Sequence, residues 1–184
     1  PAIVALSEDA LEENPFFSAP ALLPALQAYG DDRVRLACVW LGERLIGLWP
    51  VEKRRVYARL PYRHWATWTY PHCYYGAPLI AQGFENEAFK GLFALLCEDE
   101  EASGFARLGR IERDGPVYKA ALEAAKARKR IHYEAGAISR AALQGGASVE
   151  ATLAVHVRKK KRKELQRLRN RLNELGEIAV REAT

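Results

Sequence analysis

Apolar residues recur along this chain at two spacings, and each spacing predicts one kind of secondary structure. Residues 34–41 and 44–55 are apolar, β-branched runs that the dipeptide Gly42-Glu43 separates. Two such runs around a two-residue turn are typical of a β-hairpin. Residues 62–70 alternate between two sets of side chains, which predicts a third strand.

The middle of the chain carries helical and extended patterns in turn. Residues 84–99 place phenylalanine and leucine at helical spacing, and residues 115–128 form a second helical pattern. Residues 71–80 are predicted to form a loop and then a short strand, and residues 104–113 and 129–143 to form two further strands.

Two helices are expected before the hairpin. Ser7 is a suitable N-cap for the first helix, and Asn14, which precedes a proline, ends it. Ser18 is a suitable cap for the second helix, which has Pro20 in its first turn and ends at Gly30.

Together these elements predict an α+β (α/β) fold with a mixed, mostly antiparallel sheet flanked by helices. We assign residues 1–146 to this body. Residues 147–176 are predicted to form a basic linker helix that Ser148 introduces and Gly176 ends. Residues 177–184 alternate again, and we interpret them as the first strand of a further domain.

Composition changes this picture in one segment. The chain is 49% hydrophobic and 28% charged, as is usual for globular proteins. Residues 158–171 hold nine basic residues and one acidic residue, whereas the rest of the chain carries 19 basic and 22 acidic residues. The net charge of +5 therefore arises in the predicted basic helix and not in the body.

Neither secretion nor a membrane span is indicated. The N-terminus lacks the pattern of a signal peptide, and no apolar run approaches the roughly 18 to 20 residues of a spanning helix. The cysteines, Cys38, Cys73 and Cys97, are odd in number and far apart, so no disulfide framework is expected. No metal-ligand spacing is present either. We expect a cytoplasmic protein without a bound metal.

The basic helix allows several interpretations. Leucines recur in it at spacings of 3, 4 and 3, which makes one narrow apolar seam: Leu165, Leu168, Leu172 and Leu175. The segment is interpreted as a nucleic-acid clamp, a coiled-coil arm or a docked connector. In the first case the phosphate contacts would come from Lys159, Lys160, Lys161, Arg162 and Arg167. The lack of aromatic residues among the charges favours the connector.

An aromatic-rich segment is the strongest candidate for a binding site. Residues 65–75 hold six ring side chains in eleven residues. Such rings combine apolar area with a polar tip, so they suit substrate clefts, although they also suit a half-buried strand. The candidates beside the Gly-Ala-Pro loop are Trp68, Tyr70, His72 and Tyr75. No nucleophile motif, phosphate loop or dinucleotide fingerprint accompanies them.

Six stretches, in this order, resemble the CelD/BioF-like acyltransferases, which are related to the FemAB-type tandem GNAT proteins. They are NPFFSAPALLPAL, LACVWLGERLIGLWPV, YGAPLI, RIERDGPVYKAAL, SRAAL and KKKRKELQRLRNRLNELGEIAV. Together they span nearly the whole chain. The last is the most distinctive, because family members carry a basic helix ending in Leu-x-x-x-Gly there.

The resemblance implies that residues 1–146 are a GNAT-like N-terminal domain and that the basic helix joins it to a second GNAT-like half. It implies transfer of an acyl group to an amine or hydroxyl, with acyl-CoA (acetyl-CoA) or aminoacyl-tRNA as donor. The acceptor would be a small molecule or a cell-envelope polysaccharide, and Arg140 would pair with an anionic group of the substrate.

One motif of the resembled family does not occur. GNAT domains hold the CoA pyrophosphate through Q/R-x-x-G-x-G/A, and this pattern is not found between Pro1 and Thr184. We therefore expect the acyl-CoA site in the missing half, no assignable general base, and no activity of this chain alone. The alternatives are a nucleic-acid (tRNA)-binding module that uses the basic helix, and a protein-interaction domain.

Overall fold

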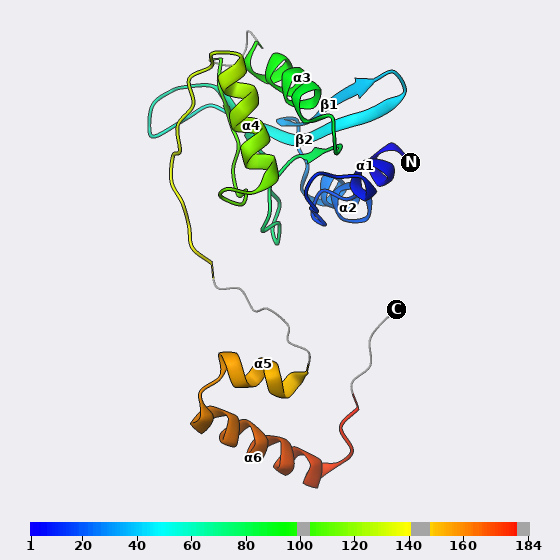
Figure 1. Ribbon diagram of the computed structural model, residues 1–184, viewed down its shortest axis with the longest axis vertical. Helices are drawn as coiled ribbons and strands as arrows, with labels where there is room; N and C mark the ends of the chain where they lie inside the picture. The colour runs from blue at the N-terminus through cyan, green and yellow to red at the C-terminus, as the bar shows by residue number, and fades with distance from the viewer. Residues whose placement is uncertain (99–103, 141–147, 180–184) are drawn as a thin grey trace. The chain divides into compact units, whose positions relative to one another are not determined.

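The hairpin expected from the apolar runs forms one side of the sheet in the computed structural model (Figure 1). Strands β1 (Val34–Leu41) and β2 (Arg44–Arg54) pair antiparallel. Gly42 in the turn has a φ of 59°, which glycine adopts without the strain that a Cβ would cause. The predicted hairpin is confirmed.

The structure describes residues 1–98, 104–140 and 148–179. The chain divides into two units, Pro1–Ala135 and Gly136–Thr184, and each is described by itself. The first unit contains a five-stranded, mostly antiparallel sheet flanked by helices, so the predicted α+β class is confirmed.

The sheet of the first unit has the strand order β1-β2-β3-β5. Strand β4 pairs with Gly47 and Leu48 of β2, whereas β3 pairs with residues 51–54 of β2. Strands β3 (His64–Thr67) and β4 (Leu79–Ile80) run antiparallel to β2, while β5 (Ala106–Arg107) runs parallel to β3. Because β2 has neighbours along both edges and is buried on both faces, it forms the middle of the core.

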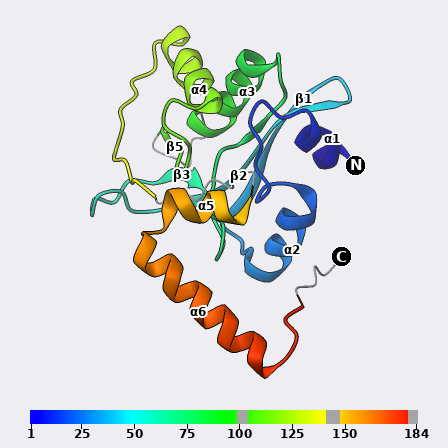
Figure 2. The ribbon, with the colours of Figure 1, turned by 60° about the horizontal axis from the view of Figure 1, so that its bottom comes forward.

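Four helices cover the two faces of this sheet (Figures 1 and 2). Helices α3 (Glu85–Cys97) and α4 (Pro116–Ala127) pack on each other on one side, and α1 (Ala2–Glu8) and α2 (Ala19–Tyr29) lie on the other. Gly91 lets α3 approach β1 closely, since a Cβ there would lie 2.7 Å from both Cγ atoms of Val39.

The first helix begins earlier than predicted. Ser7 lies near the end of α1, and its hydroxyl donates a hydrogen bond to the carbonyl of Ile3 at 2.7 Å. The prediction that Ser7 caps the N-terminus of this helix is therefore wrong, because the hydroxyl satisfies a carbonyl of the preceding turn instead. The second helix begins after Ser18 and ends before Gly30, as predicted.

Three predicted strands are shorter than expected or not formed. The strand expected over 62–70 is limited to β3, and the one over 104–113 is limited to the two residues of β5. Residues 129–140 form no strand, and residues 141–143 lie outside the described residues. The alternation in 129–140 lacks a pairing partner among the described residues, and without a ladder its backbone stays exposed.

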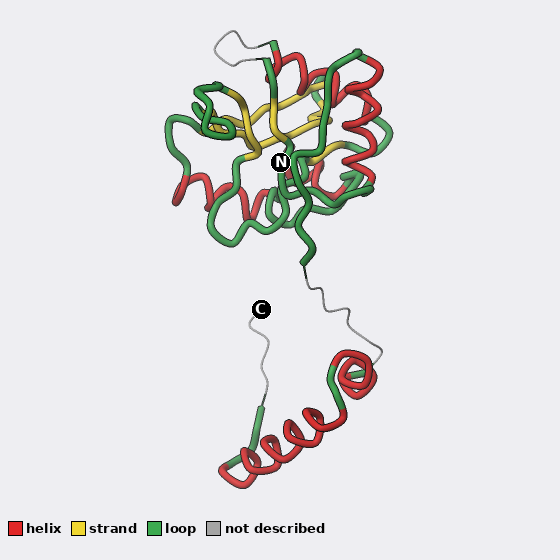
Figure 3. Tube along the Cα trace, turned by 90° about the vertical axis from the view of Figure 1, so that its left-hand side faces the viewer, coloured by secondary structure: helices red, strands yellow, loops and turns green. Residues whose placement is uncertain are grey.

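The second unit contains α5 (Val149–His156) and α6 (Lys159–Leu175), which Figure 3 shows as two separate helices. Ser148 caps α5 as predicted, because its hydroxyl accepts a hydrogen bond from the Ala151 amide at 3.1 Å. The single basic helix predicted over 147–176 is divided in two, because Val157 and Arg158 have extended backbone with ψ values of 123° and 144°. Helix α6 carries the basic run and ends before Gly176. Residues 177–179 form no strand, and 180–184 lie outside the described residues.

Candidate functional site

The aromatic segment leaves the end of β3 and runs across the first unit. Trp68 is buried, and its ring centre lies 5.5 Å from that of Tyr70. The Tyr70 hydroxyl donates a hydrogen bond to the carbonyl of Phe16 at 2.9 Å, and its ring stacks on Tyr29. Burial raises the pKa of the Tyr70 phenol, so this hydroxyl remains a neutral donor. Tyr70 thereby ties the segment to the start of the chain.

Tyr75 is also held by a hydrogen bond, and its partner is Glu12, which was not predicted from the sequence as a site residue. Its hydroxyl donates a hydrogen bond to one carboxylate oxygen of Glu12. The other oxygen of Glu12 accepts a hydrogen bond from the amide of Val117 at 3.0 Å. Since Val117 is in the first turn of α4, Glu12 caps a helix that lies about a hundred residues further along the chain.

Burial raises the pKa of the Glu12 carboxyl above its usual value, and the charge of Glu112 acts in the same direction. The hydrogen bond from Val117 opposes both effects by favouring the carboxylate. A half-buried carboxyl with a raised pKa is one form that a general acid or base takes. Here both oxygens already have protein partners, so capping accounts for the position of the group.

His72 differs from the other three ring candidates because it is exposed. Its φ of 71° places it in the left-handed region, where non-glycine residues are uncommon and often functional. The neighbouring Cys73 is buried, and Arg110 donates a hydrogen bond to the carbonyl of Cys73. Burial raises the pKa of the Cys73 thiol, although Arg110 opposes this, so the thiol is not an activated nucleophile.

The structure thus brings four of the five predicted substrate-binding residues into one unit. Trp68, Tyr70 and Tyr75 pack or bond within the protein, and His72 faces solvent. Arg140 belongs to the second unit, where it is exposed. The role of all five in substrate binding stays a prediction.

A helix N-terminus can bind an anion such as pyrophosphate, but carboxylates already lie at the N-termini of α3 and α4. Glu12 caps α4, and Glu85 and Glu87 stand in the first turn of α3. The positive end of a helix dipole attracts an anion only where it is not already matched by a carboxylate. A pyrophosphate at either N-terminus would meet negative charge.

The predicted phosphate contacts of the basic helix lie on α6. Lys159, Lys160, Lys161 and Arg167 are exposed, and Arg162 is half-buried. Lys161 forms an ion pair with Glu164 at 3.0 Å. The four leucines of the seam are all exposed, from 38% for Leu165 to 85% for Leu175. The packing of this seam between two halves of an enzyme stays a prediction.

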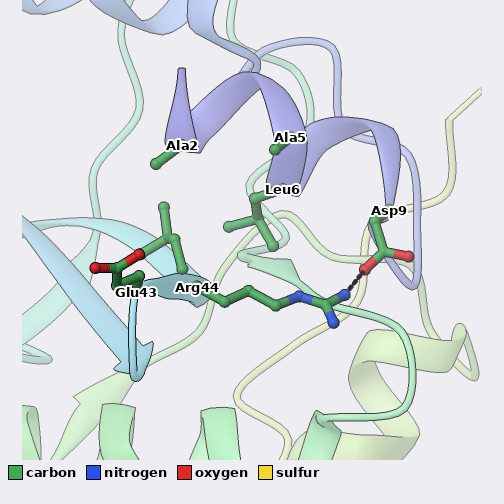
Figure 4. Close-up of a pocket in the computed structure, with 7 residues that line it drawn as sticks. Ala2, Ala5, Leu6, Asp9, Glu43 and Arg44 are labelled. Atoms are coloured by element: carbon green, nitrogen blue, oxygen red, sulfur yellow. Dashed lines mark hydrogen bonds and ion pairs between the residues drawn. The ribbon is translucent and has the colours of Figure 1, made fainter.

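A small hollow of about 210 Å³ lies between α1 and the turn of the β1–β2 hairpin (Figure 4). Its lining consists of Ala2, Ala5, Leu6, Asp9, Glu43, Arg44 and Leu45. Two of the three charged side chains in it bind each other, because Arg44 pairs with Asp9 at 2.5 Å, and Arg44 also lies over the ring of Phe84. None of the predicted site residues lines this hollow.

The part of the chain that the structure describes contains neither a candidate metal site nor a candidate membrane span. No cluster of three or more histidine, cysteine or acidic side chains in residues 1–98, 104–140 and 148–179 could hold a metal ion. Within the same residues, every helix is too short or too polar to cross a bilayer.

Comparison with known proteins identifies no relative of this chain. No protein-family model, no curated protein and no solved structure matches it. The resemblance to GNAT acyltransferases therefore remains an expectation from the sequence motifs.

Proposed function

We propose that the first unit is the N-terminal half of a GNAT-type acyltransferase, which transfers an acyl group from acyl-CoA to an amine or hydroxyl. The mixed, mostly antiparallel sheet flanked by helices is the architecture that the sequence resemblance implies. The single observation that carries the proposal is this sheet followed in the chain by a basic helix that ends at a glycine.

The donor site belongs outside this unit in the proposal. The α3 and α4 N-termini carry glutamates, which supports a division of labour in which another half binds the CoA pyrophosphate. The first unit would then contribute to acceptor binding through the segment around His72. The acceptor class in the proposal is a small molecule or a cell-envelope polysaccharide.

The first experiment measures binding of acetyl-CoA to the 184-residue protein by calorimetry. We expect no saturable binding at micromolar ligand. Saturable micromolar binding would contradict the division of labour, because the site would then lie within these residues.

The second experiment uses the complete reading frame that encodes this chain. We expect the frame to continue past Thr184 into a domain with Q/R-x-x-G-x-G/A after a strand, and the whole protein to release thiol from acyl-CoA with an acceptor present. His72→Ala should then raise the KM for the acceptor, while the exposed His156→Ala serves as control. A frame that ends at Thr184, or equal kinetics of the two variants, counts against the proposal.

A second candidate function is nucleic-acid binding, tRNA included, and the exposure of Lys159, Lys160 and Lys161 on α6 favours it. Contacts with phosphates release counterions, so retention of RNA should fall by orders of magnitude between ~50 and ~200 mM salt. Replacing these three lysines by glutamine should abolish retention. Glutamine at the exposed Arg35, Lys90 and Lys119 is the matched control, and equal loss from both triples would point to non-specific charge.

A further inference from the structure

A second basic region lies in the first unit, although the net charge of that unit is close to zero. This unit has seventeen lysines and arginines against eighteen acidic residues. Nine of the seventeen fall within residues 53–63 and 126–133, and neither stretch contains an acidic residue. We call the exposed side chains of these two stretches the basic–apolar patch.

The two stretches lie side by side although about sixty residues separate them. The hydroxyl groups of Tyr57 and Tyr133 are hydrogen-bonded to each other. Figures 1 and 2 both show the loop after β2 crossing the segment that follows α4. Tyr57 also packs edge-on against Phe105 and His64, at ring distances of 5.2 and 5.5 Å. The loop is therefore anchored to the core at one tyrosine while its other residues face outward.

The outward side chains include large apolar groups. Val56 is 59% exposed, Leu60 is 53% exposed and Ile131 is 99% exposed. Tyr62 and Tyr133 are also exposed beside them. Scattered exposed apolar residues are normal, but five on two touching stretches form a surface that water solvates poorly.

Between these apolar groups stand arginines without a carboxylate partner. Arg54 pairs with Glu52 and Arg130 pairs with Glu98. Arg55, Arg59 and Arg63 form no ion pair with any described residue. Their positive charge is therefore available to an external anion.

The tip of the loop is a tight two-residue turn in an uncommon conformation. Tyr57 and Leu60 exchange two backbone hydrogen bonds, at 2.9 and 2.8 Å. Ala58 and Arg59 between them have φ values of 48° and 69°. This geometry matches a type I′ turn, in which glycine or asparagine is usual. The turn holds Val56 and Leu60 at the tip of the loop, where both side chains are exposed. Such a tip suits insertion into an apolar environment outside the protein.

The chemistry of the patch discriminates between possible partners. A second copy would bring the six exposed cations of the patch against six more, which is repulsive. A nucleic acid would use the charges and the rings but gain little from the exposed aliphatic groups. His64 and Phe105 stack on each other at 4.7 Å, so these rings are not offered to bases. Only an anionic surface with an apolar interior uses every exposed group of the patch.

We propose that the basic–apolar patch docks the first unit onto an anionic phospholipid bilayer. Val56, Leu60 and Ile131 would enter the boundary between headgroups and acyl chains. Tyr62 and Tyr133 would lie at the headgroup level, which suits rings with a polar tip. Arg55, Arg59 and Arg63 would contact lipid phosphates, and their attraction would fall with added salt.

The test is flotation of the 184-residue protein with vesicles of phosphatidylcholine containing about 30% phosphatidylglycerol, at about 150 mM NaCl. Vesicles of phosphatidylcholine alone are the comparison. We expect partition into the anionic vesicles and little into the neutral ones. Replacing Val56, Leu60 and Ile131 by serine should lower the partition coefficient about tenfold or more without a change of charge. Replacing Arg55, Arg59 and Arg63 by glutamine should lower it about a hundredfold.

The matched control replaces three exposed apolar residues elsewhere in the unit, Val4, Leu23 and Leu41, by serine. This variant should partition like the wild type. All six serine positions are exposed, so unchanged tryptophan fluorescence is expected to show intact folding.

Four results would overturn the proposal. The wild type could fail to float, or the two serine triples could behave alike. Binding could survive the patch changes and vanish when Lys159, Lys160 and Lys161 become glutamine, which would assign it to α6. Finally, the patch variants could lose a single-stranded oligonucleotide while vesicle binding is unchanged, which would make the partner a nucleic acid.

Discussion

Leu92 in α3 and Leu168 in α6 occupy comparable places in two amphipathic helices, yet one is fully buried and the other is 46% exposed. The apolar face of α3 contacts β1, β2 and α4, so nothing of Leu92 reaches solvent. The seam of α6 remains open within its own unit. The difference teaches that periodic leucines predict a helix, whereas burial depends on what the rest of the chain places against it.

The largest expected effect breaks the buried side of this comparison. Leu92→Ala should lower the free energy of unfolding by about 2–5 kcal/mol, because it removes a buried side chain and leaves a cavity. Leu168→Ala should change it by less than about 0.5 kcal/mol, since the side chain is largely solvated. Urea unfolding followed by tryptophan fluorescence measures the effect of Leu92→Ala, because all four tryptophans lie in the first unit.

Far-UV circular dichroism should be recorded in the same titrations, because it also reports the helix that contains Leu168. A cost of several kcal/mol for Leu168→Ala would show that the seam of α6 is covered in solution, and the comparison above would fail.

The next effect concerns a hydroxyl shared by several groups beneath the aromatic segment. The Thr67 hydroxyl accepts hydrogen bonds from the Trp49 indole at 3.1 Å and from the Gly109 amide at 3.0 Å. Thr67→Val should lower the free energy of unfolding by about 1–3 kcal/mol, because it leaves these donors without a partner. Thr67→Ser keeps the hydroxyl and should cost less. Equal losses from both variants would mean that the methyl group, and not the hydroxyl, matters here.

A smaller effect is expected at Glu12, which connects two distant parts of the first unit. Glu12→Ala removes the cap of α4 and the partner of Tyr75, and should cost about 1 kcal/mol. The exposed neighbour Glu13 is the control, and Glu13→Ala should be close to neutral.

The Glu12 contribution also depends on pH in a defined direction. The pKa of this carboxyl is raised in the folded protein, so folding favours its protonated form. The corresponding stability is fully present below the unfolded pKa and is lost as the pH rises through the folded pKa. The stability of the wild type relative to Glu12→Gln should therefore decrease from about pH 4.5 upward. An increase over this range would contradict the assigned direction.

The smallest effect sharpens the exposed side of the comparison. Lys163 on α6 has Lys159 and Arg167 four residues away on either side, so like charges repel. Lys163→Glu should raise helix content measured by circular dichroism, with a gain of about 0.2–0.5 kcal/mol per pair. Salt should reduce the gain, because it screens exposed pairs. Lys163→Gln should have about half the effect, and a fall in helicity would mean that this lysine has another role.

Much of the fold follows from local patterns. The β1–β2 hairpin, α2, α3 and α4 lie close to the ranges expected from residue spacing, Gly42 and Gly30, and the end of α6 lies at the expected Gly176. Each of these features depends on neighbours within about one turn of helix or one hairpin, so it can be read from adjacent residues.

The candidate site could be predicted only in part. The sequence showed that residues 65–75 are rich in aromatic side chains, but it did not predict their hydrogen bonds to Phe16 and Glu12. The basic–apolar patch was hidden as well, because its two stretches become neighbours only through the contact between Tyr57 and Tyr133.

Sequence by itself therefore determined which segments become helices and which form the hairpin, since backbone hydrogen bonding and side-chain period are local properties. Only the tertiary structure decided that Glu12 caps α4, that residues 129–140 form no strand, and that Leu92 is buried while Leu168 is not. The physical reason is that capping, pairing and burial each need a partner from a distant part of the chain. The spacing of residues within one segment does not predict which distant residue that partner will be.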